Sequence, residues 1–299
     1  MSPLRFGCIV SFLDEEAHLD RFLSSVEAQT RPPDQLLLVD DGSRDRSVEI
    51  ASTFAATFPG ARMLSRPPRP AVRDRLVGAP ELRAFQSAVP QLAEPWDVVV
   101  KMDADLVLSP DLFETIEREF AVDPKLGIAG TYLTAIDPHT GRPTRERCPP
   151  HHARGPTKFY RRECYQQIGP LQPVLGWDTI DEIAARRYGW RTAAVTCPSG
   201  DTLHLRPTGA HDGRLRAQFR WGVCAYGIGQ HPLWVAASTV RRLADRPRVL
   251  GSFAFASGWV AARVKRTPRA PDDVRTFGRG EQLRELRRRA LGPAAMGRR

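Results

Sequence analysis

The first sixty residues alternate short apolar runs with amphipathic stretches. Residues 6–13 and 35–39 are apolar runs of strand length. After each run, apolar side chains recur at helical spacing: Leu19, Phe22, Leu23 and Val26 in the first case, and Val48, Ala51, Phe54, Ala55 and Phe58 in the second. The order strand, helix, strand, helix predicts an α/β fold in which helices cover both faces of a parallel sheet. Further strands are expected at 97–102, 127–133 and 192–195, and helices at 82–92, 110–120 and 181–188.

Carboxylates stand where two of these strands end. Asp40 and Asp41 follow the second strand, and Asp103 and Asp105 follow the run Val98-Val99-Val100-Lys101-Met102. The carboxyl ends of parallel strands meet at one edge of a sheet, so both pairs are expected to face one crevice. Two adjacent carboxylates raise each other's pKa unless a cation neutralises them. Mg²⁺ or Mn²⁺ prefers such oxygens, although Asp103 and Asp105 could instead only cap the following helix.

Length, cysteine usage and hydropathy exclude several classes of protein. The chain has 299 residues, of which 41% are hydrophobic, enough for a large core. Its five cysteines are widely spaced and form no C-x-x-C pair, which argues against a disulfide framework or a zinc site and favours a reducing compartment. The apolar N-terminal run reads as a strand and not as a signal peptide. The longest candidate for a membrane segment, residues 251–264, is shorter than the roughly 18 apolar residues that a span needs.

Five motifs in order carry a resemblance to a known family. They are "CIVSFLDEEAHLDRFLSSVEAQTRPPDQLLLVDDGSRDRSVEIA", "DVVVKMDADLVLSPDLFE", "GPTKFYRRECYQQIG", "GWDTIDEIAARRYGW" and "LHLRPTG". Together they resemble a family 2 glycosyltransferase of the GT-A fold, with its D-D-x-S and D-x-D motifs, from residue 6 to about 210. The resemblance implies a Rossmann-like three-layer α/β sandwich with a C-terminal helical extension. It also implies an inverting enzyme that needs Mn²⁺ or Mg²⁺ and binds a nucleotide-sugar.

The resemblance places the donor and the metal on particular residues. Ser11 and Leu13 would border the base, Asp41 would accept a hydrogen bond from it with Asp40 nearby, and Glu15 would belong to the same donor site. Leu13 stands where many relatives have an aromatic residue, and it could equally be a core residue.

At the metal, Asp105 would bind the ion directly, and Asp103 would bind the ribose, or the ion through water. His204 stands where some GT-A enzymes supply a further ligand, and Arg206 could meet the diphosphate.

The acceptor side is implied in "GWDTIDE". An inverting displacement needs a carboxylate that takes the proton of the acceptor hydroxyl. Asp181 is favoured, at the start of its helix, with Asp178 second and Glu182 third, because Thr179 stands where the family has its base. Asp178 or Asp181 could instead be a helix cap. Trp177 would stack on a sugar or fill the core, and Arg161 and Arg162 would lie over the donor phosphate or the acceptor.

Residues 211–299 are expected to form a separate basic, mostly helical extension to a catalytic domain of residues 1–210. From Arg206 onward there are 20 basic and 6 acidic residues, a net charge of +14, against −4 for the residues before it. Basic residues combined with aromatic ones fit a peripheral contact with an anionic membrane. A helical cover over the acceptor cleft fits equally well, whereas a nucleic-acid arm leaves the apolar content unexplained, so no specific nucleic acid is expected.

These observations favour one function over two rivals. A cytoplasmic enzyme, peripheral at the inner face of the plasma membrane, would move a sugar from a nucleoside-diphosphate sugar to a hydroxyl of a polysaccharide or lipid-linked glycan, as in bacterial cell-envelope synthesis. A nucleotidyltransferase would need a Gly-rich basic loop after the first strand, where Asp14-Glu15-Glu16 stands. A degenerate glycosyltransferase that binds sugar nucleotides without turnover would explain Leu13 and Thr179.

Overall fold

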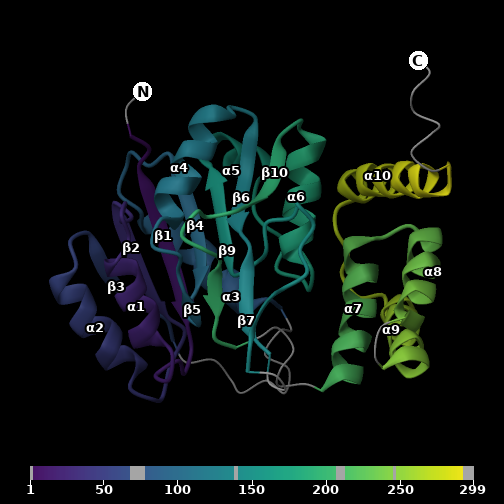
Figure 1. Cartoon of the computed structure of the whole chain (residues 1–299), viewed down its shortest axis with the longest axis horizontal. Coiled ribbons are helices and arrows are strands. Elements are labelled where there is room, and N and C mark those ends of the chain that lie inside the picture. Colours follow the sequence, from purple (N-terminus) through teal and green to yellow (C-terminus); the bar gives the residue numbers. More distant parts are fainter. Residues whose placement is uncertain (1–2, 68–77, 138–140, 207–212, 245–246, 292–299) are drawn as a thin grey trace. The chain divides into compact units, whose positions relative to one another are not determined.

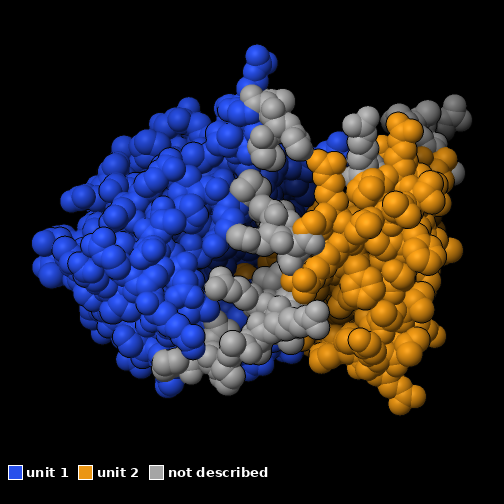
Figure 2. All heavy atoms as spheres, turned by 90° about the horizontal axis from the view of Figure 1, so that it is seen from below, with its two compact units in different colours: residues 1–173, 188–207 blue, residues 174–187, 208–299 orange. Residues whose placement is uncertain are grey.

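The computed structural model describes residues 3–67, 78–137, 141–206, 213–244 and 247–291. These residues form two compact units, shown in two colours in Figure 2. Unit 1 comprises residues 1–173 and 188–207, and unit 2 comprises residues 174–187 and 208–299. The expected domain boundary near residue 210 falls outside the described residues. The division into units also assigns residues 174–187 to the C-terminal unit.

A seven-stranded sheet forms the centre of unit 1 (Figure 1). Its order is β10-β6-β9-β4-β1-β2-β3, with β9 antiparallel to both neighbours and the other pairs parallel. The strands are β1 (Phe6–Phe12), β2 (Gln35–Asp40), β3 (Ala61–Ser65), β4 (Val98–Asp103), β6 (Leu126–Thr131), β9 (Thr157–Arg161) and β10 (Arg191–Val195). β1, β2 and β4 are buried along nearly their whole length, which explains why they read as continuous apolar runs.

Helices cover both faces of this sheet. They are α1 (Leu19–Glu27), α2 (Ser47–Thr57), α3 (Pro80–Ala88), α4 (Leu112–Val122) and α5 (Arg162–Ile168). On one face the rings of Phe6, Phe113 and Phe159 meet edge to face, which joins β1 and β9 to α4. On the other face Phe85 of α3 and Tyr165 of α5 meet Tyr160 of β9. Neighbouring residues of β9 thus point into opposite layers, and the predicted α/β sandwich is confirmed.

A second, four-stranded sheet lies beside the first and has the order β5-β11-β7-β8. Its strands are β5 (Leu106–Val107), β7 (Leu133–Ile136), β8 (Pro143–Arg145) and β11 (Thr202–His204). Residues 134–157 are polar, rich in Pro, His and Arg and without apolar periodicity, which predicts a loop; this prediction is wrong for β7 and β8, which belong to this sheet. The segment is polar, and its strands are held by pairing: β8 lies antiparallel to β7, and the amide of Glu146 donates to the carbonyl of Leu133.

Unit 2 is helical. It contains α6 (Trp177–Arg187), α7 (Arg214–Ile228), α8 (Pro232–Arg241), α9 (Arg248–Val264) and α10 (Asp272–Leu291). The helical character predicted for the C-terminal part is confirmed. α7 and α9 pack closely through glycines, since a Cβ on Gly222 or Gly258 would overlap the backbone of the other helix.

Candidate functional site

Two loops that follow β1 and β2 are tied together at the carboxyl edge of the sheet. The Asp14 carboxylate accepts from the Arg44 amide at 2.8 Å, and the Ser47 hydroxyl accepts from the Glu15 amide at 2.8 Å. Asp45 accepts from the amides of Glu16 and Ser47 at 3.0 Å, so it joins the loop after β1 to the first residue of α2. This network brings Glu15 to the place where β1, β2 and β4 end.

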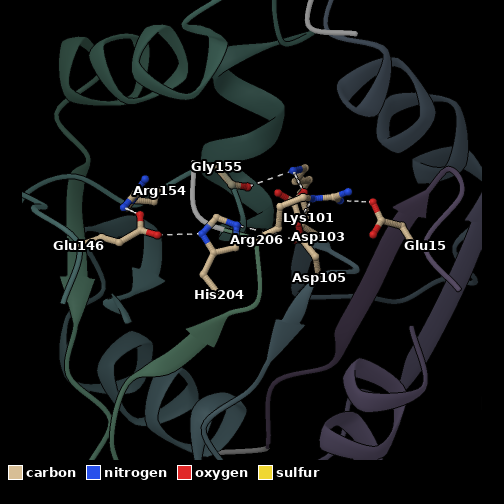
Figure 3. Close-up of polar contacts among 9 residues, drawn as sticks. All are labelled: Glu15, Lys101, Asp103, Asp105, Glu146, Arg154, Gly155, His204 and Arg206. Carbon is tan, nitrogen blue, oxygen red and sulfur yellow. Dashed lines mark hydrogen bonds and ion pairs between the residues drawn. The ribbon is translucent and has the colours of Figure 1, made fainter. Parts of the chain in front are cut away.

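Glu15, Asp105 and His204, which are buried, form a cluster with the half-buried Arg206 at this edge (Figure 3). Arg206 lies between two acids: its Nε donates to Asp105 Oδ2 at 3.1 Å, and its terminal nitrogen contacts Glu15 Oε1. His204 Nε2 is 3.8 Å from Asp105 Oδ1. β11 pairs with β5 and thereby holds His204 opposite Leu106, one residue beyond Asp105. The four residues come from segments as far apart as 15 and 206, as the sequence predicts for a single site.

Two carboxylate oxygens of this cluster have no hydrogen-bond partner within the described part of the chain. They are Asp105 Oδ1 and Glu15 Oε2, and both are buried. Burial, reinforced by the nearby Asp103 charge, raises the pKa of Asp105. Burial also raises the pKa of Glu15, against the opposing effect of Arg206. An unpaired buried oxygen on a carboxylate is costly, so this side of the cluster is built to meet a cation or a hydrogen-bond donor.

Two residues of the cluster, Asp105 and His204, have side chains that can bind a hard divalent cation. Burial lowers the pKa of His204, which keeps the imidazole neutral and able to bind a metal near pH 7. Asp105 Oδ1 and His204 Nε2 are thus an oxygen and a nitrogen ligand close to one another. Among the described residues no group of three or more His, Cys, Asp or Glu side chains is arranged to hold an ion. The chain would therefore supply two ligands and leave the remaining positions to a substrate and water.

His204 and Asp103 are each held by a residue that the motifs did not single out. Glu146 Oε1 lies 2.9 Å from His204 Nδ1, and Arg154 contacts the other oxygen of Glu146. Asp103 is paired with Lys101, a buried lysine that also donates to the Gly155 carbonyl at 3.1 Å. Figure 3 shows these contacts running from Arg154 to Glu15. Lys101 could have been noticed in the sequence, because it is the one charge inside the run Val98–Met102; Glu146 lies in the segment that was read as a loop.

The predicted base-binding residues lie near the same edge. Asp40 Oδ1 accepts from the Ser43 amide at 2.8 Å and forms the turn after β2. Asp41 is buried and pairs with Arg66 at 2.6 Å, at the end of β3. Ser11 lies across from Asp103 in the pairing of β1 with β4, and Leu13 is half-buried just beyond β1. Their roles toward a base remain predictions.

Arg161 and Arg162 are not where a phosphate site would need them. The antiparallel pairing places Arg161 opposite Val98, at the far end of β4 from Asp103. The Arg161 side chain donates to the carbonyls of Phe120 at 2.7 Å and Leu126 at 3.0 Å. Arg162 pairs with Glu94 and lies over the Trp96 ring. Both arginines hold the opposite end of the sheet together, which does not fit a place over the donor phosphate; the alternative, a place over the acceptor, remains a prediction.

The four acceptor-side candidates belong to α6 in unit 2. α6 begins at Trp177, so Asp178 lies in its first turn and Asp181 in its second, not at the start as expected. Trp177, Asp181 and Glu182 are buried, and Asp181 Oδ1 accepts from the Glu182 amide at 2.6 Å. Their roles in catalysis remain predictions.

Comparison with known proteins finds similarity in part of the sequence and in the fold. Residues 8–78, which span β1, β2 and β3, match the family model described as "Glycosyl transferase family 2". A search of curated protein sequences finds no match. Residues 8–78 are thus similar to glycosyl transferase family 2, and the fold of the chain is that of the GT-A glycosyltransferases.

Solved structures share this fold at low sequence identity. One is a mannosyltransferase from Pyrobaculum calidifontis in complex with GDP-Man and Mn²⁺, with a TM-score of 0.55, 15% identity and coverage of 98% of this chain and 84% of that chain. Another is residues 1–349 of TarS from S. aureus in complex with UDP-GlcNAc, with a TM-score of 0.52, 14% identity and coverage of 95% and 92%. At these identities the likeness shows the fold.

Proposed function

We propose that the protein is a metal-dependent glycosyltransferase. It moves a sugar from a nucleoside-diphosphate sugar to an acceptor hydroxyl, with inversion at the transferred carbon. The observation that carries this proposal is Asp105, a buried carboxylate at the end of β4 whose Oδ1 is unpaired beside His204. The family match over β1 to β3 and the ligands named for the two similar structures, GDP-Man with Mn²⁺ and UDP-GlcNAc, support it.

Asp105 and His204 would hold Mn²⁺ or Mg²⁺. When bound, the ion would stabilise the negative charge that develops on the diphosphate leaving group. Arg206 lies against Asp105 and Glu15, so its guanidinium would stand beside the ion and the diphosphate. In the presence of a diphosphate, Arg206 can exchange a carboxylate for phosphate oxygens without leaving the site.

The donor's nucleoside would lie along the ends of β1 and β2. Ser11 and Leu13 would border the base, and Asp41, kept in place by Arg66, would accept a hydrogen bond from it. Asp40 stabilises the turn after β2 by accepting from the Ser43 amide. Glu15 contacts Arg206 and so connects this edge to Asp105 and His204. Asp103 would bind the ribose. The Lys101 ammonium contacts one oxygen of Asp103 and would hold this carboxylate in place at the end of β4.

The acceptor side would be carried by α6. A single displacement needs a base that takes the proton from the attacking hydroxyl, and Asp181 is the first candidate, with Asp178 second and Glu182 third. Trp177 would support the acceptor sugar or the helix itself. The acceptor we propose is a polysaccharide or a lipid-linked glycan, in keeping with a cytoplasmic protein at the inner face of the plasma membrane. None of the helices that the structure describes is long and apolar enough to cross a bilayer.

Two measurements test the proposal. Asp105→Ala is expected to lower Mn²⁺-dependent donor turnover at least about a hundredfold. The change removes both carboxylate oxygens of Asp105: Oδ1, which would bind the ion, and Oδ2, which holds Arg206. Asp20→Ala, an exposed aspartate on α1, is the matched control and should behave like the wild type. Full activity of Asp105→Ala would refute the assignment.

Titration of nucleotide-sugars with Mn²⁺ then separates an enzyme from a degenerate module. UDP-, GDP- and dTDP-linked sugars are compared by calorimetry and by release of the nucleoside diphosphate. Binding without turnover for every donor and acceptor tried would favour a binding module. The nucleotidyltransferase alternative has no support, because the loop after β1 carries Asp14, Glu15 and Glu16 and no glycine.

A further inference from the structure

Helix α9 is apolar on both of its faces. Between Arg248 and Arg263 it carries fourteen residues without a charge, Val249 to Ala262. One face, with Gly251, Phe255, Gly258 and Ala262, is buried. A helix that is apolar all round normally has both faces covered, by protein or by lipid.

The second face of α9 is exposed. Val249 is 69% exposed, Phe253 71% and Val264 75%, and Val260 and Leu250 are also more than half exposed. Val249, Phe253, Val260 and Val264 follow the spacing i, i+4, i+11, i+15 and so form one stripe along the helix. Single exposed apolar residues need no explanation, but a stripe four turns long on one helix marks a contact surface.

Both ends of the stripe are basic. Arg248 stands at its start, and Arg263, Lys265 and Arg266 stand at its end, all exposed. From Arg241 to Arg269 the chain has eight basic residues and one acid. A second copy of this chain on the stripe would bring these like charges together without acids to pair them, which is unfavourable. A partner with an apolar layer bordered by negative charge would match both the apolar stripe and its basic ends.

We propose that the exposed face of α9 docks on an anionic lipid surface. Phe253 and its apolar neighbours would enter the boundary between head groups and acyl chains, and the arginines and lysine at the two ends would lie at the level of the phosphates. The uncharged stretch is about 21 Å long, too short to cross the roughly 30 Å hydrocarbon core, so α9 would lie along the surface. α7 covers the other face of α9 and would keep the helix folded away from lipid. The proposal does not depend on the transferase activity.

Vesicle binding of the full chain tests this proposal. Phosphatidylcholine vesicles with and without phosphatidylglycerol are sedimented with the protein at low salt, without nucleotide or metal. The wild type is expected to bind the anionic vesicles, and Phe253→Asp to lower the partition coefficient about tenfold or more, because a phenylalanine leaves the apolar layer. Lys265→Gln should weaken binding roughly fivefold and reduce its salt dependence, because one basic charge is lost.

Val122→Asp is the matched control, since Val122 is an exposed apolar residue at the end of α4 in unit 1. It should bind vesicles like the wild type. Val249→Ser repeats the test with a milder change, and circular dichroism confirms that each variant is folded. Three results would overturn the proposal: no binding by the wild type, equal binding by Phe253→Asp and Val122→Asp, or a dimer in light scattering that Phe253→Asp dissociates. Each of these would leave the donor and metal site untouched.

Discussion

Glu146 sets the orientation of His204. A carboxylate can only accept, so the 2.9 Å contact requires the imidazole to donate from Nδ1 and leaves Nε2 unprotonated on the side of Asp105. Partners of this kind fix a metal-binding histidine, and their loss typically costs ten- to a hundredfold in metal affinity. Glu146→Ala is therefore expected to weaken Mn²⁺ binding by about that factor, with Glu146→Gln in between.

Mn²⁺ binding to these variants is measured directly, by electron paramagnetic resonance of the free ion. Glu27→Ala, an exposed glutamate on α1, serves as the control. Unchanged affinity in Glu146→Ala would show that His204 either holds its ring without Glu146 or does not bind the metal. A His204→Ala variant distinguishes these two cases, because it weakens Mn²⁺ binding only if the imidazole is a ligand.

We expect the carboxyl of Asp105 to make the metal-free protein less stable near neutral pH. Burial and the Asp103 charge raise its pKa in the folded state. The ionised form is thus less favourable in the folded chain than in the unfolded one, and this cost is absent below the ordinary value of 3.8 and complete above the raised pKa. Asp105→Asn is expected to unfold at a higher temperature than the wild type at neutral pH without metal, with a difference that shrinks as the pH falls toward 4.

Thermal unfolding across this pH range checks the expectation. Adding Mn²⁺ with a nucleoside diphosphate should reverse the order, since a ligand at a hundred times its Kd stabilises the wild type by about 2.7 kcal/mol. A lower melting temperature for Asp105→Asn at neutral pH, in the absence of metal, would mean that the pair with Arg206 outweighs the cost of burial.

At the scale of single residues, the strand-end pattern predicted the place of Asp105, and the resemblance to family 2 glycosyltransferases added His204 and Arg206; the structure brings the three side chains together. The sequence did not place Glu146, Arg154 or the contact between Lys101 and Asp103. Glu146 is positioned by its pairing with Leu133 beside β8, Arg154 lies outside the strands, and Lys101 and Asp103 belong to β4 of the large sheet, so no apolar period marks these contacts. β9 is antiparallel to β4, so Arg161 and Arg162 lie at the end of β4 that is far from Asp103. The local sequence does not indicate the direction of a strand, so this placement could not be predicted.

At the scale of elements, α7 and α9 are held together by two glycines. An added Cβ on Gly258 would overlap the carbonyl oxygen of Phe219, whereas one on Gly251 would meet Gln218 and Pro247 at 3.5 Å, an ordinary contact. Gly258→Ala is expected to destabilise unit 2 by about 1–3 kcal/mol, because two helix backbones must separate. Gly251→Ala, in the same helix, should be neutral or stabilising by up to about 1 kcal/mol through helix propensity.

Urea unfolding followed by circular dichroism gives both values. The pair is informative because the two variants share the chemical change and the helix, and differ in what the new methyl group meets. Equal effects would contradict the close approach of the two helices.

Strands and helices with a strong apolar period were predicted well from the sequence. β1, β2 and β4 are continuous apolar runs, and α1 buries Leu19, Phe22, Leu23 and Val26 as its spacing requires. β3 and β8 carry polar or mixed side chains, and they exist because an edge of a sheet is available to pair with them. The start of α6 was missed because Trp177-Asp178-Thr179 looks like a capping segment, yet the helix begins there.

At the scale of the whole molecule, the two units are interleaved along the chain. α6 comes before β10 and β11 in sequence, yet it belongs to unit 2 with the C-terminal helices. Its contacts there are specific: Arg186 pairs with Glu281 at 2.8 Å and Arg187 with Asp273 at 3.1 Å. The candidate base on α6 therefore depends on residues beyond 210, although the candidate metal ligands do not.

A chain that ends at residue 210 tests this dependence. It keeps the seven-stranded sheet, Asp105, His204 and Arg206, but it removes α7 and α10, on which α6 packs. We expect hydrogen exchange to show protected amides in β1, β2 and β4 and unprotected ones in α6, because a single amphipathic helix of eleven residues is not stable without a partner. Such a chain should bind Mn²⁺ with a nucleoside diphosphate and fail to transfer the sugar. Transfer at the wild-type rate would instead place the base outside α6, and protected α6 amides would show that unit 1 alone is sufficient to hold the helix.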